Sequence, residues 1–425
     1  MRKVLVLAFC LVLGMAVFAG GSTEEGGSTQ PVVINYYDWD VPNQSFIDDF
    51  NREHPHIKVI VNEIPANAER TTKLDILAMS GGDMDVMPIA DGAQFIRFEQ
   101  GMLSSLDEFI ERDGLDMESS FGKYAEWGKG SDGHYYGIPF RATQSMVWYN
   151  KAMFDEAGVP YPSDDWTYDE YIETARKMAQ WGRSKGIYGT YTHTYSNEWA
   201  TIAGQVGQWY TPDGACNIRD DAWVRALEIR KMLDNEGTQM SYGQIKAVKA
   251  VINSSFLGGK NAMTVAGSWL CRDMKNKEKF PFDFEVGIAY MPRYDESVEG
   301  NRSNFSASIL GIPAKSEHKE EAWEFIKYYV QNASKAIAAS GNMPTYLPAY
   351  TSEVVDIYRE GSGLEYDYAA KFFNPDVRLT TNKILGPDGA KYMQIIDNNV
   401  QLYFTDEISL DKTLTQIEEQ FKKEL

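Results

Sequence analysis

Residues 133–151 read GHYYGIPFRATQSMVWYNK, and this stretch decides the fold. Its aromatic and β-branched residues predict one strand over residues 135–140 and a second over residues 145–150. Residues 141–144, Arg-Ala-Thr-Gln, form a polar break between the two. Two strands that meet end to end around a polar joint indicate a chain that passes from one folded body into another. Ligands tend to bind at such junctions, so we expect a site near Arg141.

The chain before this stretch alternates strands with helices. Strands and helices are predicted, in chain order, at residues 32–37, 45–53, 57–64, 69–80 and 85–90. This order is typical of a parallel α/β sheet, in which ligands collect at the carboxyl ends of the strands. Trp39, Asp40 and Asp91 follow such strand ends and are therefore candidate binding residues.

The chain after this stretch continues with helices and buried strands. A capping box at residues 167–170 predicts the start of a helix, because the Thr and Glu side chains can satisfy its first backbone N–H groups. A strand over residues 187–192 leads into a polar, aromatic loop that contains Tyr195 and Asn197. Both residues are candidates for contact with a ligand.

Aromatic residues in the loops are further candidates, because a Trp or Tyr ring offers an apolar face with a polar group at its edge. Trp209 belongs to an aromatic pair, Trp269 follows a buried strand over residues 262–266, and Tyr346 lies in a turn-rich segment. Burial in a core is the alternative for Trp39 and Trp209, since tryptophan is usually well buried.

The N-terminus has the pattern of a secretory signal peptide. Two basic residues precede an apolar run and a group of small residues, so we expect residues 1–20 to be cleaved and residues 21–30 to form a flexible tether. Cys10 is lost with the signal peptide. Cys216 and Cys271 remain, and the sequence leaves open whether they form a disulfide or stay as free thiols.

Composition and motifs point to binding rather than catalysis. The net charge of −20 argues against nucleic acids and anionic membrane surfaces as partners, because the field of the protein would repel them. The five histidines show no metal-ligand spacing, and the chain has no nucleophile elbow, P-loop or dinucleotide fingerprint. We therefore predict no cofactor, no metal and no catalytic residue. A glycosidase carboxylate pair stays an alternative, because 61 acidic residues always offer some pair.

Five blocks of the chain resemble the extracellular solute-binding proteins of carbohydrate ABC importers, the family that includes maltodextrin-binding protein. The blocks are residues 81–86 (GGDMDV), 101–110 (GMLSSLDEFI), 137–140 with 148–151 (GIPF and WYNK), 259–263 with 267–269 (GKNAM and GSW) and 314–326 (AKSEHKEEAWEFI). They lie between residues 81 and 326 and follow the order of the family.

The resemblance implies an α/β fold of the two-lobed periplasmic binding protein type. Each lobe would be a mostly parallel sheet flanked by helices, and hinge crossings would join the lobes, which close over the ligand. The first lobe would hold residues 31–141 and 290–342, and the second would hold residues 142–289 and 343–425.

The resemblance also implies roles for individual residues. Trp269 matches the family's sugar-stacking tryptophan, which ends the pattern Met-Thr-x-x-Gly-x-Trp. Trp39, Asp40 and Asp91 match positions where the first lobe offers a ring and hydrogen-bonding carboxylates. Residues 141–144 would form a hinge crossing at the floor of the cleft. Whether their polar side chains contact the ligand or serve the hinge alone stays open.

The implied function is capture of a sugar or oligosaccharide by a monomeric, non-enzymatic periplasmic protein, and its delivery to membrane-spanning ABC permease subunits. Two alternatives stay open: a secreted glycoside-acting enzyme, and a protein of the same fold that binds a non-sugar solute. A polyamine would require carboxylates, which Asp40 and Asp91 would supply. A glycerol phosphoester would require several cations in the cleft, and Arg141 and Arg302 are the candidates.

The chain departs from many family members in one position that bears on anchoring. Those members carry a lipid on a cysteine directly after the signal peptide, whereas Gly21 occupies this position here. The sequence therefore favours a free periplasmic protein over a lipid-anchored one.

Overall fold

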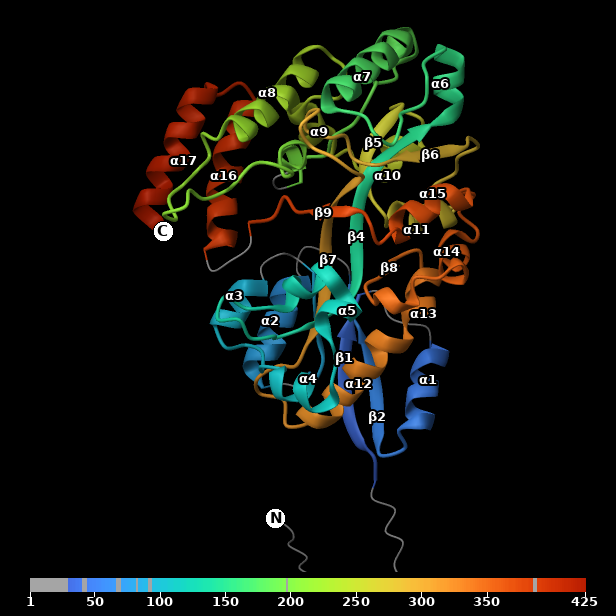
Figure 1. Cartoon of the computed structure of the whole chain (residues 1–425), viewed down its shortest axis with the longest axis vertical. Helices are drawn as coiled ribbons and strands as arrows, with labels where there is room; N and C mark the ends of the chain where they lie inside the picture. The colour runs from blue at the N-terminus through green and yellow to red at the C-terminus, as the bar shows by residue number, and fades with distance from the viewer. Residues whose placement is uncertain are drawn as a thin grey trace, which may run out of the picture.

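The computed structural model describes residues 30–39, 44–65, 70–81, 83–90, 94–195, 198–384 and 388–425. The expected signal peptide, the tether up to residue 29, and the candidate residues Asp40, Asp91 and Asn197 lie outside the described residues. Two bodies, here called the first and the second lobe, lie one above the other along the long axis of the molecule, and the long strand β4 (Ile138–Asn150) runs between them (Figure 1).

The first lobe is the lower body in Figure 1 and begins with the predicted alternation. Its strands β1 (Val32–Asp38) and β2 (Ile57–Glu63) pair in parallel, and the short β3 (Met87–Ile89) follows. Its helices are α1 (Gln44–Glu53), α2 (Arg70–Ser80), α3 (Gln94–Glu99), α4 (Asp107–Asp113), α5 (Met117–Phe121) and α12 (Lys319–Asn332), with the 3-10 helix η1 (Gly122–Gly128). Tyr36 of β1 and Phe50 of α1 pack against Phe325 of α12, so segments almost 300 residues apart share one core.

The second lobe is the upper body and is mainly helical (Figure 1). Its helices are α6 (Lys151–Ala157), α7 (Tyr168–Gly182), α8 (Asp221–Asn235), α9 (Tyr242–Val248), α10 (Ile252–Leu257), α11 (Leu270–Lys275), α16 (Gly389–Phe404) and α17 (Leu410–Glu424), with the 3-10 helices η2 (Arg183–Lys185) and η3 (Glu198–Ile202). Its strands are β5 (Met263–Gly267) and β6 (Val286–Ala289). The predicted capping box is confirmed, because Thr167 and Glu170 satisfy each other's backbone N–H groups at the start of α7.

The remaining elements connect the lobes. The strand β7 (Arg302–Gly311) returns to the first lobe beside β4, and α12 follows it. The chain then rises along one side of the molecule through short helices and crosses back to the middle at its last strand, which pairs with β7 (Figure 1). The elements of this segment are α13 (Ser334–Ala339), β8 (Met343–Pro344), η4 (Leu347–Ala349), α14 (Ser352–Arg359), α15 (Tyr366–Ala370), η5 (Lys371–Phe373) and β9 (Arg378–Thr380).

The sequence prediction of two strands with a break at residues 141–144 was wrong, because β4 is one continuous strand. Its register shifts between Pro139 and Arg141, and the strand then continues through the polar residues. The polar residues do not end the strand, because Arg141 and Thr143 line a cleft on one face and Gln144 donates a hydrogen bond to the Tyr124 hydroxyl on the other. The predicted strand at residues 187–192 is also wrong: this segment makes one isolated bridge, between Tyr188 and Asn261.

The pairing of the strands differs from the expected mostly parallel sheets. The described strands form the pair β1–β2 and a seven-stranded sheet built around β4 and β7. In that sheet β7–β9 is parallel, whereas β4–β5, β4–β6, β4–β7, β4–β8 and β3–β7 are antiparallel. The reason is the crossing itself: β4 and β7 carry the chain between the lobes in opposite directions, so they lie antiparallel and their neighbours pair with them.

The chain just after residue 290, the expected lobe boundary, is hydrogen-bonded to residues 166 and 205. The backbone N–H of Arg293 donates to the carbonyl of Trp166 at 2.7 Å, and that of Tyr294 donates to the side chain of Gln205 at 3.0 Å. Both acceptors belong to the second lobe, so β7 makes the crossing. Among the described helices, none is long and apolar enough to cross a membrane. Cys216 and Cys271 are both free.

Candidate functional site

The crossing strands form a polar ladder where the two lobes meet. Arg141, Thr143 and Ser145 of β4 lie opposite Ser308, Ser306 and Asn304 of β7, respectively. Because strand side chains alternate between two faces, these six side chains share one face of the sheet. We call these three opposed pairs the ladder.

The other face of the same strands is packed against the first lobe. Phe305 lies between the ladder residues Asn304 and Ser306, and its ring packs on Tyr124 and Trp127 of η1 at centroid distances of 5.6 and 5.4 Å. Gln144, which is 2% exposed, donates to the Tyr124 hydroxyl at 2.7 Å. The segment 141–144 therefore has two different faces, a polar one that forms the cleft floor and a buried one that packs against the first lobe.

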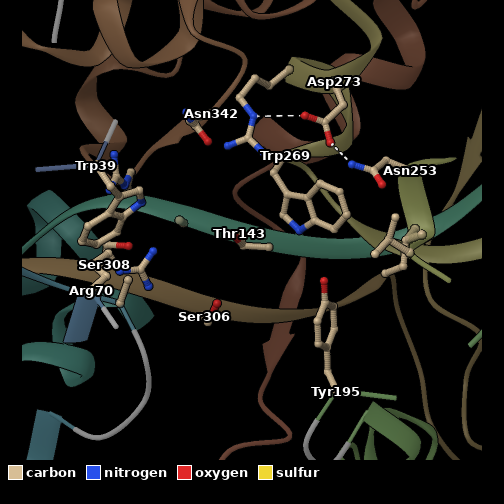
Figure 2. Close-up of a pocket in the computed structure, with 16 residues that line it drawn as sticks. Trp39, Arg70, Thr143, Tyr195, Asn253, Trp269, Asp273, Ser306, Ser308 and Asn342 are labelled. Carbon is tan, nitrogen blue, oxygen red and sulfur yellow. Dashed lines mark hydrogen bonds and ion pairs between the residues drawn. The ribbon is translucent and has the colours of Figure 1, made fainter. Parts of the chain in front are cut away.

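A cleft of about 790 Å³ lies over the ladder and is lined by both lobes; we call it the main chamber (Figure 2). Its lining residues are Trp39, Arg70, Ala90, Arg141, Ala142, Thr143, Tyr195, Val251, Ile252, Asn253, Trp269, Arg272, Asp273, Ser306, Ser308 and Asn342. The volume lies within the range of small-molecule sites. The lining combines aromatic rings with hydroxyl, amide, carboxylate and guanidinium groups, so it offers both donors and acceptors.

Asp38, at the end of β1, organises the first-lobe wall of the main chamber. Its Oδ1 accepts from Arg141 Nη2 at 3.0 Å and from the backbone N–H of Trp39 at 2.7 Å. The Tyr36 hydroxyl donates to the same carboxylate, and burial raises the pKa of Tyr36 well above its usual value, so the phenol keeps its proton. The guanidinium carbons of Arg70 and Arg141 lie 3.9 and 4.6 Å from the Trp39 ring centroid. Trp39 is thus held in place by cation–π contacts.

Trp269, at the end of β5, forms the opposite wall. Its indole extends over β4 above Thr143 and toward the hydroxyl of Tyr195 (Figure 2). This approach depends on Gly267, because a Cβ there would lie 2.4 Å from both Thr143 Cγ2 and Trp269 Nε1. A glycine two residues before the tryptophan is therefore a steric requirement of this geometry, and it belongs to the pattern that identified Trp269.

A hydrogen-bonded row continues the second-lobe wall. Asp273, in α11, accepts from Asn253 Nδ2 at 2.9 Å and from Arg272 Nε at 3.3 Å (Figure 2). Asp273 is 8% exposed, and Arg272 is the charged one of these two neighbours. Arg272, Asp273 and Asn253 all line the main chamber.

A smaller cavity of about 340 Å³ adjoins the main chamber; we call it the side chamber. Five residues line both: Thr143, Tyr195, Ile252, Trp269 and Ser306. Seven further residues line the side chamber alone: Ser145, Glu198, Ala266, Gly267, Asn304, Asn382 and Lys383. Burial raises the pKa of Glu198, and the charge of Lys383 partly opposes that shift.

Four of the residues proposed from the sequence meet at the cleft: Trp39, Arg141, Tyr195 and Trp269 all line the main chamber. Trp209 and Tyr346 do not line either chamber. Trp209 stacks on Trp223 with ring centroids 3.9 Å apart and so belongs to the second-lobe core, which was the alternative for this residue. Tyr346 packs on Phe121 instead, at a centroid distance of 5.9 Å.

Several lining residues were missed by the sequence reasoning. The alternation Asn304-x-Ser306-x-Ser308 has the period of a strand with one polar face and could have been found. Arg70 and Arg272 carry no local signal, since only the packing of their helices brings them to the cleft. Arg302, considered as a cleft cation, is fully buried and donates to the carbonyls of Glu299 and Gly300. No cluster of three metal-binding side chains occurs in the described part of the chain.

The model of the family described as bacterial extracellular solute-binding protein matches residues 39–336. A binding protein of Brucella abortus is 23% identical over 334 residues, which cover 77% of each chain. The mannitol-binding protein of Pseudomonas aeruginosa is 23% identical over 339 residues, which cover 71% of each chain.

Solved structures add a comparison of the fold. A sugar transporter from Rhizobium etli in an open conformation superposes with a TM-score of 0.76 at 24% identity, over 92% of this chain and 99% of that one. This likeness confirms the two-lobed α/β fold that the resemblance implied.

Proposed function

Because the chain belongs to the family of bacterial extracellular solute-binding proteins, we propose that it captures a sugar or an oligosaccharide between its lobes and delivers it to an ABC permease. The observation that carries this proposal is the composition of the main chamber, where Trp39 lies beside the Arg141 end of the polar ladder and Trp269 lies above Thr143 in its middle (Figure 2). The mannitol-binding relative adds a polyol ligand within the same family.

The chemistry of a sugar matches this lining. A pyranose ring has apolar C–H faces that stack on an indole, and Trp269 offers such a face beside Thr143. Its hydroxyls need both donors and acceptors, because a buried unpaired hydroxyl costs about 1–3 kcal/mol. The hydroxyls of Ser306 and Ser308, and the amide of Asn253, provide both within one cleft.

Hinge closure would convert binding into a signal for the permease. The ladder lies on β4 and β7, the strands that cross between the lobes, so a ligand on the ladder contacts the hinge itself. A ligand that touches both lobes binds the closed form better and shifts the open–closed equilibrium toward it. We place the lobe boundaries within β4 and β7, and the second of these lies later in the chain than the expected boundary at residue 290.

We further propose that the protein acts as a monomer, binds its ligand without altering it, and is released free into the periplasm after cleavage of residues 1–20. The N-terminal pattern and Gly21 in place of a lipid-carrying cysteine support free release. The Asp273 carboxylate in the main chamber is tied to Asn253 and Arg272, which supports a binding role over an acid–base role.

A thermal-shift screen over mono- and oligosaccharides tests the proposal. A ligand at a hundred times its dissociation constant should stabilise the protein by about 2.7 kcal/mol, which raises the melting temperature measurably. Trp269→Ala should remove most of the shift. Trp181→Ala is the matched control, because Trp181 lies in α7 away from both chambers and contacts Lys185. If no sugar or polyol raises the melting temperature, the proposal is wrong.

A solute that carries an anionic group is the second candidate, and the arginines of the main chamber favour it. Arg70, Arg141 and Arg272 come from α2, β4 and α11 and so approach the cleft from both lobes. Their charges also argue against a polyamine, because like charges repel. Arg141 is already paired with Asp38, and the negative charge of Asp38 weakens the electrostatic attraction between Arg141 and an anion.

The same screen separates this candidate from a neutral sugar. Glucuronate and glycerol 3-phosphate are the anionic probes, and glucose and mannitol are the neutral ones. Binding of an anion should weaken as salt rises, because screening shortens the reach of the arginine charges, whereas binding of a neutral sugar should not. Stabilisation by the anions alone would favour the second candidate.

A further inference from the structure

The side chamber holds a buried donor that the fold leaves unused. Asn304 is 8% exposed and lines the side chamber, and its Nδ2 has no hydrogen-bond partner among the described residues. Buried amide groups are nearly always paired, because an unpaired donor loses its hydrogen bonds to water without replacement. The amide of Asn304 is therefore placed to donate to something that enters the side chamber.

The ladder connects this donor to the main chamber without interruption. Ser145 and Asn304 form its second-lobe end, Thr143 and Ser306 its middle, and Arg141 with Ser308 its far end. The middle pair lines both chambers, as does Trp269. Successive pairs are two residues apart, so the three span about 13 Å along the strands. This is longer than one sugar ring, whereas a chain of linked rings would reach all three pairs.

The charges of the side chamber favour a neutral occupant. Glu198 lines it and would repel the carboxylate or phosphate of an acidic unit, while Lys383 lines it as well and would repel an ammonium group. A carboxylate and an ammonium group together suit hydroxyls, because a hydroxyl donates a hydrogen bond to the carboxylate and accepts one from the ammonium group. The shared Trp269 ring offers an apolar surface at the boundary between the two chambers.

We propose that the side chamber is a second sugar subsite and that the ligand is an oligosaccharide of at least two units. One unit lies in the main chamber, and the next lies in the side chamber, where Asn304 Nδ2 donates to one of its oxygens. Trp269 contacts both units across the linkage. This inference rests on the proposed function, because it assigns a chain length to the sugar captured there.

Calorimetric titration of the protein with matched sugar pairs tests the inference. The probes are glucose with maltose and maltotriose, xylose with xylobiose, arabinose with arabinobiose, and mannose with mannobiose. We expect at least one disaccharide to bind ten or more times tighter than its own monosaccharide. Equal affinity for a monosaccharide and its oligomers would overturn the second subsite, although sugar capture would still stand.

Two variants then locate the second unit. Asn304→Leu removes the amide donor at a similar side-chain volume. Ser145→Val narrows the side chamber by replacing a hydroxyl with a larger apolar group. Each should lower disaccharide affinity about tenfold, the effect of one lost hydrogen bond, and change monosaccharide affinity less than twofold. Unchanged melting temperatures would show that both variants fold. If both variants weaken the two sugars equally, the side chamber is no separate subsite. If no sugar binds at all, the proposed function fails together with the inference.

Discussion

Arg141 donates a hydrogen bond to Asp38 at 3.0 Å and so joins the strand that crosses between the lobes to the end of β1. The two side chains are 9% and 0% exposed. The same carboxylate fixes the backbone of Trp39, whose ring lies against the Arg141 guanidinium. One buried ion pair therefore sets the position of an aromatic wall relative to the polar ladder.

We predict that Asp38→Asn destabilises the protein by about 3–5 kcal/mol, because it removes a buried negative charge that pairs with the Arg141 guanidinium. Urea unfolding followed by tryptophan fluorescence measures this loss. Asp411→Asn is the matched control, since Asp411 pairs with Arg219 at 3.1 Å but is 85% exposed. An exposed pair is worth about 0–1 kcal/mol. Similar losses for the two variants would show that the Asp38 pair contributes no more than a surface pair.

Gly267→Ala should displace the Trp269 indole and lower ligand affinity about tenfold or more. The added Cβ would lie 2.4 Å from Trp269 Nε1 and from Thr143 Cγ2, so the indole must move or the strands must separate. Such overpacking typically costs about 1–3 kcal/mol of stability as well. Titration of tryptophan fluorescence with the ligand measures the affinity.

The matched control for this change is Gly243→Ala in α9, where an added Cβ meets nothing within 4 Å. Alanine is about 0.5–1 kcal/mol better than glycine in a helix, so this variant should be slightly more stable and bind normally. If Gly267→Ala also binds normally, the indole does not need the position described above.

Acid should destabilise the protein in part through His193, whose pKa is lowered to about 4 by burial and by the nearby charges of Arg230 and Lys246. An unfolded histidine has a pKa of about 6.5, so the folded state binds fewer protons between the two values. This stability contribution is complete above about pH 6.5 and is lost as the pH falls toward 4. Because one pKa unit is worth about 1.4 kcal/mol and the ring is partly exposed, we expect a loss of about 1–3 kcal/mol.

Two measurements check the histidine prediction. The ring proton resonances of His193 should titrate with a midpoint near pH 4 in NMR spectra. His193→Gln should flatten the fall of the unfolding free energy between pH 6.5 and 4 relative to the wild type. In the structure, Nδ1 of His193 lies 2.8 Å from the Tyr191 hydroxyl. A titration midpoint near pH 6.5 would show that the ring is solvated instead and would contradict the prediction.

Local signals in the sequence predicted the local features of the site. The capping box at Thr167 depends on four consecutive residues, and it occurs as predicted. Trp269 was found because it follows a buried strand and stands two residues after Gly267. The polar stretch after Phe140 was interpreted as a break, because polarity alone does not show that every second side chain faces a cleft while Gln144 is buried on the other face.

Features that depend on long-range packing could not be predicted in this way. Arg70 and Arg272 lie some 200 residues apart in the sequence and reach one cleft only because β4 and β7 bring the lobes together. Trp209 was a candidate cleft residue because it is an aromatic residue in a loop. Its ring instead stacks on Trp223 of α8 and packs against the second-lobe core. A sequence shows where the aromatic residues are, but it does not show which residues they pack against.

Both cysteines that follow the signal segment should be free thiols. Cys271 is fully buried and donates to the Tyr358 carbonyl at 3.3 Å, while Cys216 Sγ lies 3.0 Å from the Tyr392 hydroxyl. Burial raises the pKa of Cys271 to about 11, so the native thiol should be nearly inert to a thiol reagent at pH 8. In denaturant without reductant, protein lacking residues 1–20 should react with Ellman's reagent at two thiols per chain. Fewer than two would indicate a disulfide.

The two faces of β4 should separate binding from stability in a pair of adjacent variants. Thr143 lines both chambers, so Thr143→Val should weaken ligand binding by removing a hydroxyl at nearly constant shape. Gln144 faces away from the cleft and donates to the Tyr124 hydroxyl at 2.7 Å and to the Phe372 carbonyl at 3.2 Å. Gln144→Met removes this donor from two buried acceptors, which should cost about 1–3 kcal/mol of stability.

We therefore expect Thr143→Val to change affinity by about tenfold with little change in the urea midpoint, and Gln144→Met to lower the midpoint with little change in affinity. Each variant serves as the control for the other, because they are neighbours on one strand and differ in the face that they alter. Equal effects of the two variants on affinity would mean that packing on the buried face of β4 also affects the ligand site. In that case the contacts of Gln144 with Tyr124 and Phe372 would govern closure of the lobes as well as their stability.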